Sequence, residues 1–344
     1  GGGVTLIEES LSLSPGAARD SGRTKAKPPA AARRHRGGGD DGSDGTQLLL
    51  GAFRPKMPGD PKSLDDFEKR YGRVPGLVVW FQAWGDDQNN AFDPALLDRV
   101  KAVGATPMIT WEPWVPGKGV NQSDFTLAKI AKGDHDAYID QWAKGLTNWN
   151  GTVLLRFAHE MNGDWYPWAV ANETNGNAPG DFIDAWQHVH KRFENAKAGN
   201  VRWVWAPNVK YDGSHPLSEL YPGGQYVDWI GMDGYNWAGS RRSSKWRSLK
   251  NVFGPTYDEL TASPFDNKPI MVAETGCPGR RPEKADWIRK GLLSAVPKQF
   301  PKLQAVVYFD AKTDRDWRAN TSGDIRKAFS AVVKSDRYRG ALDG

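Results

Sequence analysis

The sequence has one cysteine in 344 residues, and this scarcity excludes several kinds of site. An internal disulfide needs two cysteines, and a zinc or iron–sulfur centre held by thiolates needs more. Cys277 follows a short apolar run, and no neighbouring base motif would activate it as a nucleophile. The pattern therefore favours a buried structural thiol over a catalytic one.

Long apolar runs and two common cofactor motifs are also missing. No run approaches the roughly 18 apolar residues of a membrane span, so none is predicted. No GxGxxG motif follows the first predicted strand, and His159-Glu160 lacks the second histidine of a zinc-binding HExxH helix. The sequence therefore predicts neither a nucleotide cofactor nor a metal site.

The net charge is small, +5, and acidic residues are interspersed with basic ones. This balance does not indicate a nucleic-acid partner. The basic residues between 241 and 247 are expected to form a solvated loop. His188 and His190 lie on opposite faces of a predicted helix, where structural or solvated histidines are the default.

The first 46 residues differ in composition from the rest, being rich in Gly, Ala, Pro, Ser and charge. Such a segment cannot bury enough apolar area to offset its ordering entropy, and we predict a disordered linker over 1–46. A single catalytic domain is expected over 47–335, with a tail over 336–344. The chain starts at Gly1, not Met, so we expect a secreted or cell-surface protein whose export signal or anchor has been removed.

From residue 47, short apolar runs alternate with helical patterns. Asp93-Pro94 has the cap and first-turn proline of a helix start, Ser63 is expected as a further N-cap, and a last helix is expected from about Ser322. Continuous apolar strands, each followed by a helix, indicate a parallel sheet covered on both faces, and eight of them fit a (β/α)8 barrel. The predicted strands are 48–53, 77–81, 106–110, 153–158, 201–206, 227–232, 269–273 and 305–310.

Polar and aromatic residues gather where these strands end, which is where (β/α)8 barrels place their active sites. Glu160 follows the fourth strand and Glu274 ends the seventh. One such carboxylate is often only salt-bridged, but two at the same end of two buried strands are what glycosidic-bond cleavage needs. The 16 tryptophans serve the core, and rings of this kind also stack on sugars. The candidates at strand ends are Trp84, Trp111, Glu112, Trp114, His159, Glu160, Trp165, Asn208, Asp233, Tyr235, Glu274 and Phe309.

The run Arg156-Phe-Ala-His-Glu-Met-Asn-Gly163, followed by Trp165-Tyr-Pro-Trp168, resembles the signature of glycoside hydrolase family 26. The resemblance covers about residues 47–335 and is specific at strands four, six and seven. It implies an acid/base at Glu160 and a nucleophile at Glu274. It also implies that His159, Trp165, Asp233 and Tyr235 line the subsite of the cleaved sugar. Trp111, Glu112, Trp114, Asn208 and Phe309 are further expected substrate-binding residues.

The family resemblance implies a retaining endo-β-glycosidase that needs no cofactor and acts on a polysaccharide, and we expect a monomer. Endo-1,4-β-mannanase is the first expectation. Mannanases of the family commonly have a histidine after strand three, where this chain has Trp111-Glu112-Pro113-Trp114. Mixed-linkage β-glucanase and β-1,3-xylanase therefore stay as alternatives. A barrel that binds carbohydrate without catalysis is the alternative of another class, but it would lose one carboxylate, and both are present here.

Overall fold

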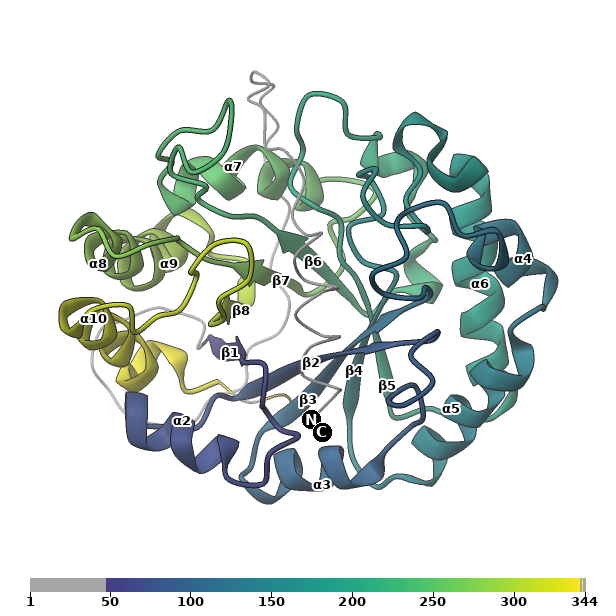
Figure 1. Cartoon of the computed structure of the whole chain (residues 1–344), viewed down its shortest axis with the longest axis horizontal. Coiled ribbons are helices and arrows are strands. Elements are labelled where there is room, and N and C mark those ends of the chain that lie inside the picture. The colour runs from purple at the N-terminus through teal and green to yellow at the C-terminus, as the bar shows by residue number, and fades with distance from the viewer. Residues whose placement is uncertain (1–47, 341, 343–344) are drawn as a thin grey trace.

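The computed structural model describes residues 48–340 and 342. Eight parallel strands pair in chain order, and the last closes on the first, so the predicted barrel is confirmed (Figure 1). The predicted linker over 1–46 lies outside the described residues. The strands are β1 (Leu49–Phe53), β2 (Leu77–Ala83), β3 (Thr106–Glu112), β4 (Val153–Phe157), β5 (Val201–Trp205), β6 (Trp229–Asp233), β7 (Ile270–Thr275) and β8 (Leu303–Phe309).

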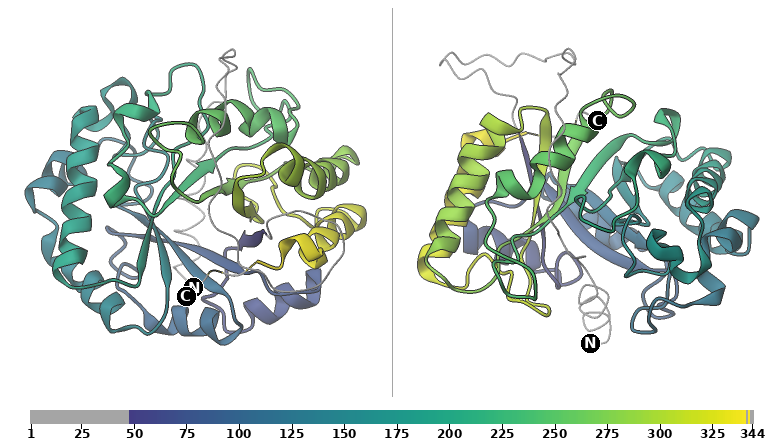
Figure 2. Two further views of the ribbon diagram at one scale, coloured as in Figure 1. Left: turned by 180° about the vertical axis from the view of Figure 1, so that it is seen from behind. Right: turned by 90° about the horizontal axis from the view of Figure 1, so that it is seen from above.

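Helices form an outer ring around the strands, as both faces of the molecule show (Figures 1 and 2). Between β7 and β8, a π-helical turn over Arg289–Ala295 joins two helices into one continuous element. No described helix is both long and apolar enough to cross a membrane. The helices are α2 (Ser63–Tyr71), α3 (Pro94–Ala102), α4 (Leu127–Lys132), α5 (Asp136–Asn148), α6 (Pro179–Asn195), α7 (Leu249–Leu260), α8 (Glu283–Ile288), α9 (Val296–Gln299) and α10 (Gly323–Lys334).

Of the two predicted helix caps, the one at Asp93 is confirmed, and the last helix starts at Ser322 as expected. Asp93 accepts a hydrogen bond from the Ala95 amide, and Ser322 accepts one from the Ile325 amide. The prediction for Ser63 was wrong, because this residue is already the first of α2. Its hydroxyl donates to the Asp60 carbonyl at 2.6 Å, so the serine ties the helix start to the preceding turn.

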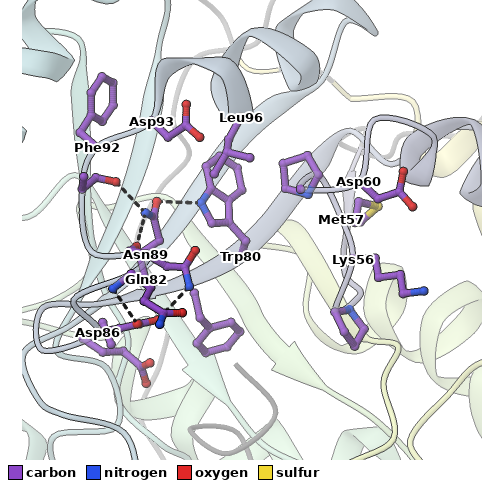
Figure 3. A pocket seen from close by; sticks show the side chains of 18 of the residues that line it. Lys56, Met57, Asp60, Trp80, Gln82, Asp86, Asn89, Phe92, Asp93 and Leu96 are labelled. Atoms are coloured by element: carbon purple, nitrogen blue, oxygen red, sulfur yellow. Dashed lines mark hydrogen bonds between the residues drawn. The ribbon is translucent and has the colours of Figure 1, made fainter. Parts of the chain in front are cut away.

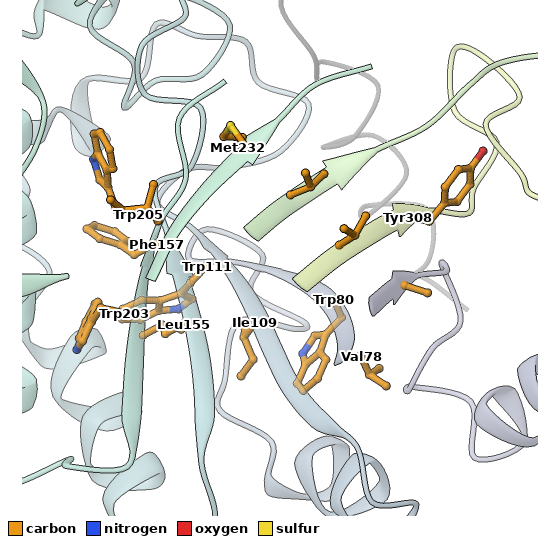
Figure 4. Close-up of a cluster of buried hydrophobic side chains, with 14 of the residues drawn as sticks. Val78, Trp80, Ile109, Trp111, Leu155, Phe157, Trp203, Trp205, Met232 and Tyr308 are labelled. Carbon is orange, nitrogen blue, oxygen red and sulfur yellow. The ribbon is translucent and has the colours of Figure 1, made fainter. Parts of the chain in front are cut away.

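The strands are buried on both faces, and alternate residues point inward and outward. Trp80, Trp111, Phe157 and Trp203 point outward and pack against the helices (Figure 4). A second, inner cluster fills the barrel, with Leu77, Met108 and Val204 among its members. On β3, Trp111 therefore faces the helices while Glu112 faces the barrel axis.

A β-bulge in β7 interrupts this alternation. Met232 of β6 pairs with Val272, but the next residue, Asp233, pairs with Glu274, so Ala273 is an extra residue on β7. Without the extra residue, Glu274 would share the outward direction of Val272. Bulges re-aim side chains near active sites, and this one turns Glu274 into the barrel mouth.

The first residues of the predicted C-terminal tail contact the barrel. Residues 336–340 pack on the barrel: the Leu48 amide donates to the Arg337 carbonyl, and the Gly340 amide donates to the Leu48 carbonyl. Tyr338 is buried and donates a 2.6 Å hydrogen bond to the Leu292 carbonyl. A tyrosine with one apolar face and a satisfied hydroxyl anchors this segment beside β1, so the domain extends beyond residue 335.

Candidate active site

Glu160 and Glu274 lie at the carboxyl ends of β4 and β7, and both are buried. With His159 and Asp233 they offer four side-chain atoms that all lie within 4.8 Å of one another. Retaining glycosidases hold their two carboxyl groups about 5–5.5 Å apart, whereas inverting enzymes leave about 6.5–9.5 Å for a water. One oxygen of Glu160 and one of Glu274 therefore approach within 4.8 Å, which agrees with the shorter of the two separations.

The backbone that carries Glu160 adopts an uncommon conformation. Ala158 and Glu160 have φ of 48° and 57°, in the left-handed region that non-glycine residues rarely occupy. The Glu160 amide donates to the Ala206 carbonyl at 2.8 Å, which helps hold the turn in place. Such strain costs about 1–3 kcal/mol per residue and persists where surrounding structure enforces it. The turn directs both His159 and Glu160 into the barrel mouth.

The carboxylate of Glu274 receives two strong donors. The Tyr235 hydroxyl donates to Oε1 at 2.5 Å, and the Arg156 guanidinium donates to Oε2 at 2.6 Å. Phe309 meets the Tyr235 ring edge to face at 5.9 Å, and Trp317 lies 4.8 Å away, so the tyrosine is held from two sides. Together these contacts fix the orientation of Glu274.

Arg156 is the central group of the site and was not among the predicted site residues. It is fully buried, and it contacts both oxygens of Asp233 at 3.0 and 2.8 Å in addition to Glu274. Its Nε donates to the Thr110 hydroxyl at 3.0 Å. A buried arginine needs such complete pairing, because an unpaired charge is very costly to desolvate. The sequence feature that could have indicated this role is an arginine inside the otherwise apolar run of the fourth strand.

We expect Arg156→Met to destabilise the fold by about 3–5 kcal/mol, since two buried carboxylates lose their counter-charge. Urea unfolding of the two proteins would measure the difference. Arg192→Met is a matched control: Arg192 pairs with Asp140 at the surface of α6, where ion pairs contribute about 0–1 kcal/mol. Equal losses in the two variants would contradict the central role of Arg156.

Glu160 is held by Trp165, whose indole nitrogen donates to Oε1 at 2.9 Å. The ring folds back over Gly163, where a Cβ atom would lie 2.2 Å from it, so only glycine fits. Burial, and then the charge of Glu274, raises the pKa of Glu160 to about 7, against the lowering effect of hydrogen bonds with Asp233 and Trp165. A carboxylic acid with this pKa can hold a proton at neutral pH and release it during a reaction.

His159 is neutral in this setting, because burial and the nearby Arg156 charge hold its pKa well below the ordinary range. Its Nε2 lies 3.9 Å from Oε2 of Glu274, and neither ring nitrogen has a hydrogen-bond partner among the described residues. The ring is enclosed by Phe81, Tyr166 and Trp168 at 5.0–5.9 Å. The ring is therefore held by packing and not by hydrogen bonds to the described residues.

Two of the aromatic residues predicted to bind substrate, Trp111 and Trp114, are buried in the structure. Trp111 is fully buried on the outer side of β3, among rings of α5 and α6 that include Trp142 and Phe193. Trp114 is also fully buried and meets Tyr166 and Trp168 edge to face. Neither ring has exposed surface to offer a sugar. Sequence cannot separate the two faces of a strand whose faces are both apolar.

The other predicted residues lie near the cluster, and their roles stay predictions. Asp233 is bound by Arg156, and Trp165 is partly exposed with Tyr211 beside it at 5.9 Å. Asn208 is buried and forms an isolated bridge with Asp233. Phe309 stacks on Phe53 at 4.9 Å inside the barrel. Cys277 is buried, and burial raises the pKa of its thiol to about 12, which suits a structural role.

The four clustered residues could in number hold a metal ion, since a histidine and three carboxylates are common ligands. Arg156, however, already occupies both oxygens of Asp233 and one of Glu274. A guanidinium in the middle of the carboxylates supplies the positive charge that a metal would bring. The arrangement therefore favours acid–base and nucleophilic chemistry.

Comparison with known proteins agrees with this geometry. A model of the family described as glycosyl hydrolase family 26 matches residues 106–263, which run from β3 through α7. Endoglucanase H of Acetivibrio thermocellus is 32% identical over 297 residues, which is 85% of this chain. The chain belongs to glycoside hydrolase family 26. The resemblance noted in the sequence is thereby confirmed.

The relatives of this family 26 chain carry different names. A mannan endo-1,4-beta-mannosidase of Bacillus subtilis is 27% identical over 225 residues, covering 63% of this chain and 50% of that protein. Among solved structures, a β-mannanase of the family from Bacteroides ovatus superposes with a TM-score of 0.64 at 19% identity, covering 85% and 90% of the two chains. The chain spans about a third of the length of Endoglucanase H, at 31%.

Proposed function

We propose that this protein is a retaining endo-β-glycosidase that cleaves a β-linked polysaccharide by double displacement. The observation that carries the proposal is the pair Glu160 and Glu274, with side-chain oxygens within 4.8 Å in a family 26 barrel. A barrel that only binds carbohydrate would have no need of this spacing, nor of a carboxyl group whose pKa is raised to about 7.

The first step uses both glutamates at once. Oε2 or Oε1 of Glu274 attacks the anomeric carbon, while protonated Glu160 gives its proton to the departing glycosidic oxygen. Tyr235 and Arg156 hold the attacking carboxylate in position. In the second step Glu160, now ionised, takes a proton from water, and that water displaces Glu274 from the sugar. Bonding of the sugar to Glu274 removes the negative charge that had raised the pKa of Glu160, so the same group can act as base.

Two polymers are candidates for the substrate. β-Mannan is the first, as several relatives are named mannan endo-1,4-beta-mannosidases. A β-glucan is the second, because the relative matched over 85% of this chain is named an endoglucanase. The run Trp111-Glu112-Pro113-Trp114, which lacks the histidine that mannanases of the family commonly have after strand three, also favours the second.

The test is reducing-sugar release from mannan, glucomannan, lichenan, cellulose and β-1,3-xylan, followed by analysis of the anomer formed first. Internal cleavage of at least one polymer with retained configuration is expected. An inverted product would overturn the mechanism, and no release from any polymer would overturn the enzyme assignment.

The pH dependence of the reaction should follow the proton on Glu160. With a pKa of about 7, the acid loses its proton as the pH rises through neutrality, so kcat/KM should fall about tenfold per pH unit on the alkaline side. The same profile measured with an aryl glycoside whose leaving group needs no protonation should lack this alkaline fall. An identical fall with both substrates would assign the titration to another group.

A further inference from the structure

The loops at the barrel mouth are held by different kinds of side chain. After β2, the neutral Gln82 amide donates to the Asn89 and Ala91 carbonyls at 3.0 Å, beside a cavity of about 760 Å³ (Figure 3). Between the loop after β7 (276–282) and the loop after β8 (310–322), the link is a charged group, the ammonium of Lys284 on α8. Lysine is almost never fully buried, yet the Lys284 side chain has no exposed surface.

Four oxygen atoms accept hydrogen bonds from the Lys284 ammonium. Nζ donates to the Gly279 carbonyl of the loop after β7 at 3.1 Å, and to the Arg318 carbonyl of the loop after β8 at 2.6 Å. The Asp316 carbonyl at 3.4 Å and the Thr321 hydroxyl at 3.2 Å, both in the loop after β8, complete the set. An ammonium has three donors, so none of them lacks an acceptor. Burial lowers the pKa of Lys284 to about 8, so the group is charged at neutral pH and below.

The ammonium lies at the junction of the two loops. Three backbone carbonyl oxygens converge on it, and their partial negative charges would repel each other without a cation between them. The same loops are also joined directly: the Gly279 amide donates to the Asp316 carbonyl at 2.9 Å, and the Thr321 hydroxyl donates to the Gly279 carbonyl at 2.7 Å. Lys284 is therefore the centre of a hydrogen-bonded junction that fixes the loop after β8 against the loop after β7.

The loop held by Lys284 carries Trp317, which lies between two of the residues whose carbonyls bind the ammonium. The Trp317 carbonyl also accepts a 2.8 Å hydrogen bond from the Tyr308 hydroxyl. The Trp317 ring belongs to the inner cluster and contacts the Tyr235 ring at 4.8 Å. Tyr235 in turn donates to Oε1 of Glu274 at 2.5 Å. Two rings in contact therefore connect the position of the ammonium to the orientation of the Glu274 carboxylate.

We propose that Lys284 is a positioning residue for the nucleophile Glu274. Its ammonium holds the loop after β8 where Trp317 packs against Tyr235, and the packed tyrosine keeps its hydrogen bond to the carboxylate. The proposal rests on the proposed function, because it concerns the same glutamate. Lys284 lies outside the cluster of four acidic and histidine side chains and acts on it only through the two rings. Precise placement has a large effect on rate, since a shift of about 1 Å in a reacting group can cost about 10²-fold.

The experiment measures how fast an activated 2-deoxy-2-fluoro glycoside, made from the sugar that the wild type releases, labels Glu274. Such a reagent forms a glycosyl-enzyme that is hydrolysed slowly, so the labelling rate constant reports the first displacement alone. Lys284→Met keeps the length of the side chain and removes its charge. At saturating reagent it should lower the labelling rate constant by about 10-fold to 100-fold.

Tyr338→Phe is the control for lost stability, because it removes the buried hydrogen bond to the Leu292 carbonyl in the C-terminal segment. Both variants should unfold at lower urea concentration than the wild type, but Tyr338→Phe should keep its labelling rate constant within about twofold. Circular dichroism at the assay temperature would show that both are folded. If Lys284→Met lost stability and labelled Glu274 at the wild-type rate, the residue would have a structural role only, and the proposal would be overturned.

A double-mutant cycle tests the connection through Tyr235. Tyr235→Phe keeps the ring, removes the hydrogen bond to Glu274, and should itself slow labelling. If Lys284 acts through this bond, adding Lys284→Met to Tyr235→Phe should change the rate constant by less than about threefold, because residues that act as one unit are not additive. An undiminished effect of Lys284→Met in the Tyr235→Phe background would contradict the proposal.

Thr321→Val is the second variant, for use if Lys284→Met does not fold. It is nearly isosteric and removes one acceptor of the ammonium together with the hydrogen bond to Gly279, so labelling should slow by about threefold. An unchanged rate in Thr321→Val would then overturn the proposal. Failure of the reagent to label Glu274 in the wild type would overturn the proposed function. Normal labelling in the wild type and in the Lys284 or Thr321 variant would overturn only the positioning role.

Discussion

Replacement of Glu274 by alanine is expected to lower turnover on every substrate by about 10⁴-fold to 10⁶-fold, the range seen when a covalent nucleophile is removed. No other described carboxylate can take its place, since Asp233 is bound by both oxygens to Arg156. The fold should survive, because Arg156 keeps Asp233 as its counter-charge. Initial rates with a sensitive aryl glycoside, with circular dichroism as the test of folding, would measure the loss.

Rescue of the Glu274→Ala variant by azide is a second test of the nucleophile. The shortened side chain leaves room for a small anion beside the anomeric carbon, and Glu160 can still protonate the leaving oxygen. Azide should therefore restore cleavage in one displacement, with a glycosyl azide of inverted configuration. Glu259→Ala is the matched control, because Glu259 is a partly exposed residue of α7 that pairs with Lys210 within the described chain, and the variant should keep wild-type activity. A Glu274→Ala enzyme within tenfold of the wild type would remove the nucleophile from this position.

Replacement of Glu160 by alanine should have an effect that depends on the leaving group. On polysaccharide, whose leaving oxygen needs a proton, the loss of the general acid should cost about 10²-fold to 10⁴-fold. On aryl glycosides with acidic phenols, attack by Glu274 should continue, and the glycosyl-enzyme should accumulate because its base is gone. A burst of phenol followed by a slow steady state would show this in stopped-flow absorbance.

Rescue by azide in the Glu160→Ala variant also distinguishes the roles of the two glutamates. In Glu160→Ala it needs no base and should release the glycosyl-enzyme as a product of retained configuration, because two displacements have occurred. A rescued product of inverted configuration would mean that the two glutamates have exchanged roles. Glu160→Gln, which keeps the side-chain volume and the Trp165 contact, should lose activity on polysaccharide to a similar degree and so exclude a packing effect.

Much of the site could be predicted because the barrel imposes a simple rule. Continuous apolar runs predict buried parallel strands, and parallel strands bring their carboxyl ends to one face. Glu160 and Glu274, though 114 positions apart in the sequence, therefore lie at the same end of the barrel.

The positions of the aromatic residues were harder to predict from the sequence. On β3, Trp111 and Glu112 are neighbours, yet one packs among helices and the other faces the catalytic cluster.

What the sequence by itself determined is the order of the eight strands and the placement of Glu160 and Glu274 at the same end of the barrel. The tertiary structure decided which way the side chains point. The extra residue at Ala273 turns Glu274 inward, and Arg156 from β4 joins it to Asp233 from β6. The physical reason is that the pattern of buried positions follows from the apolar residues along the chain. A bulge, a left-handed turn at Glu160 and a salt bridge across the barrel instead depend on neighbours that are distant in sequence.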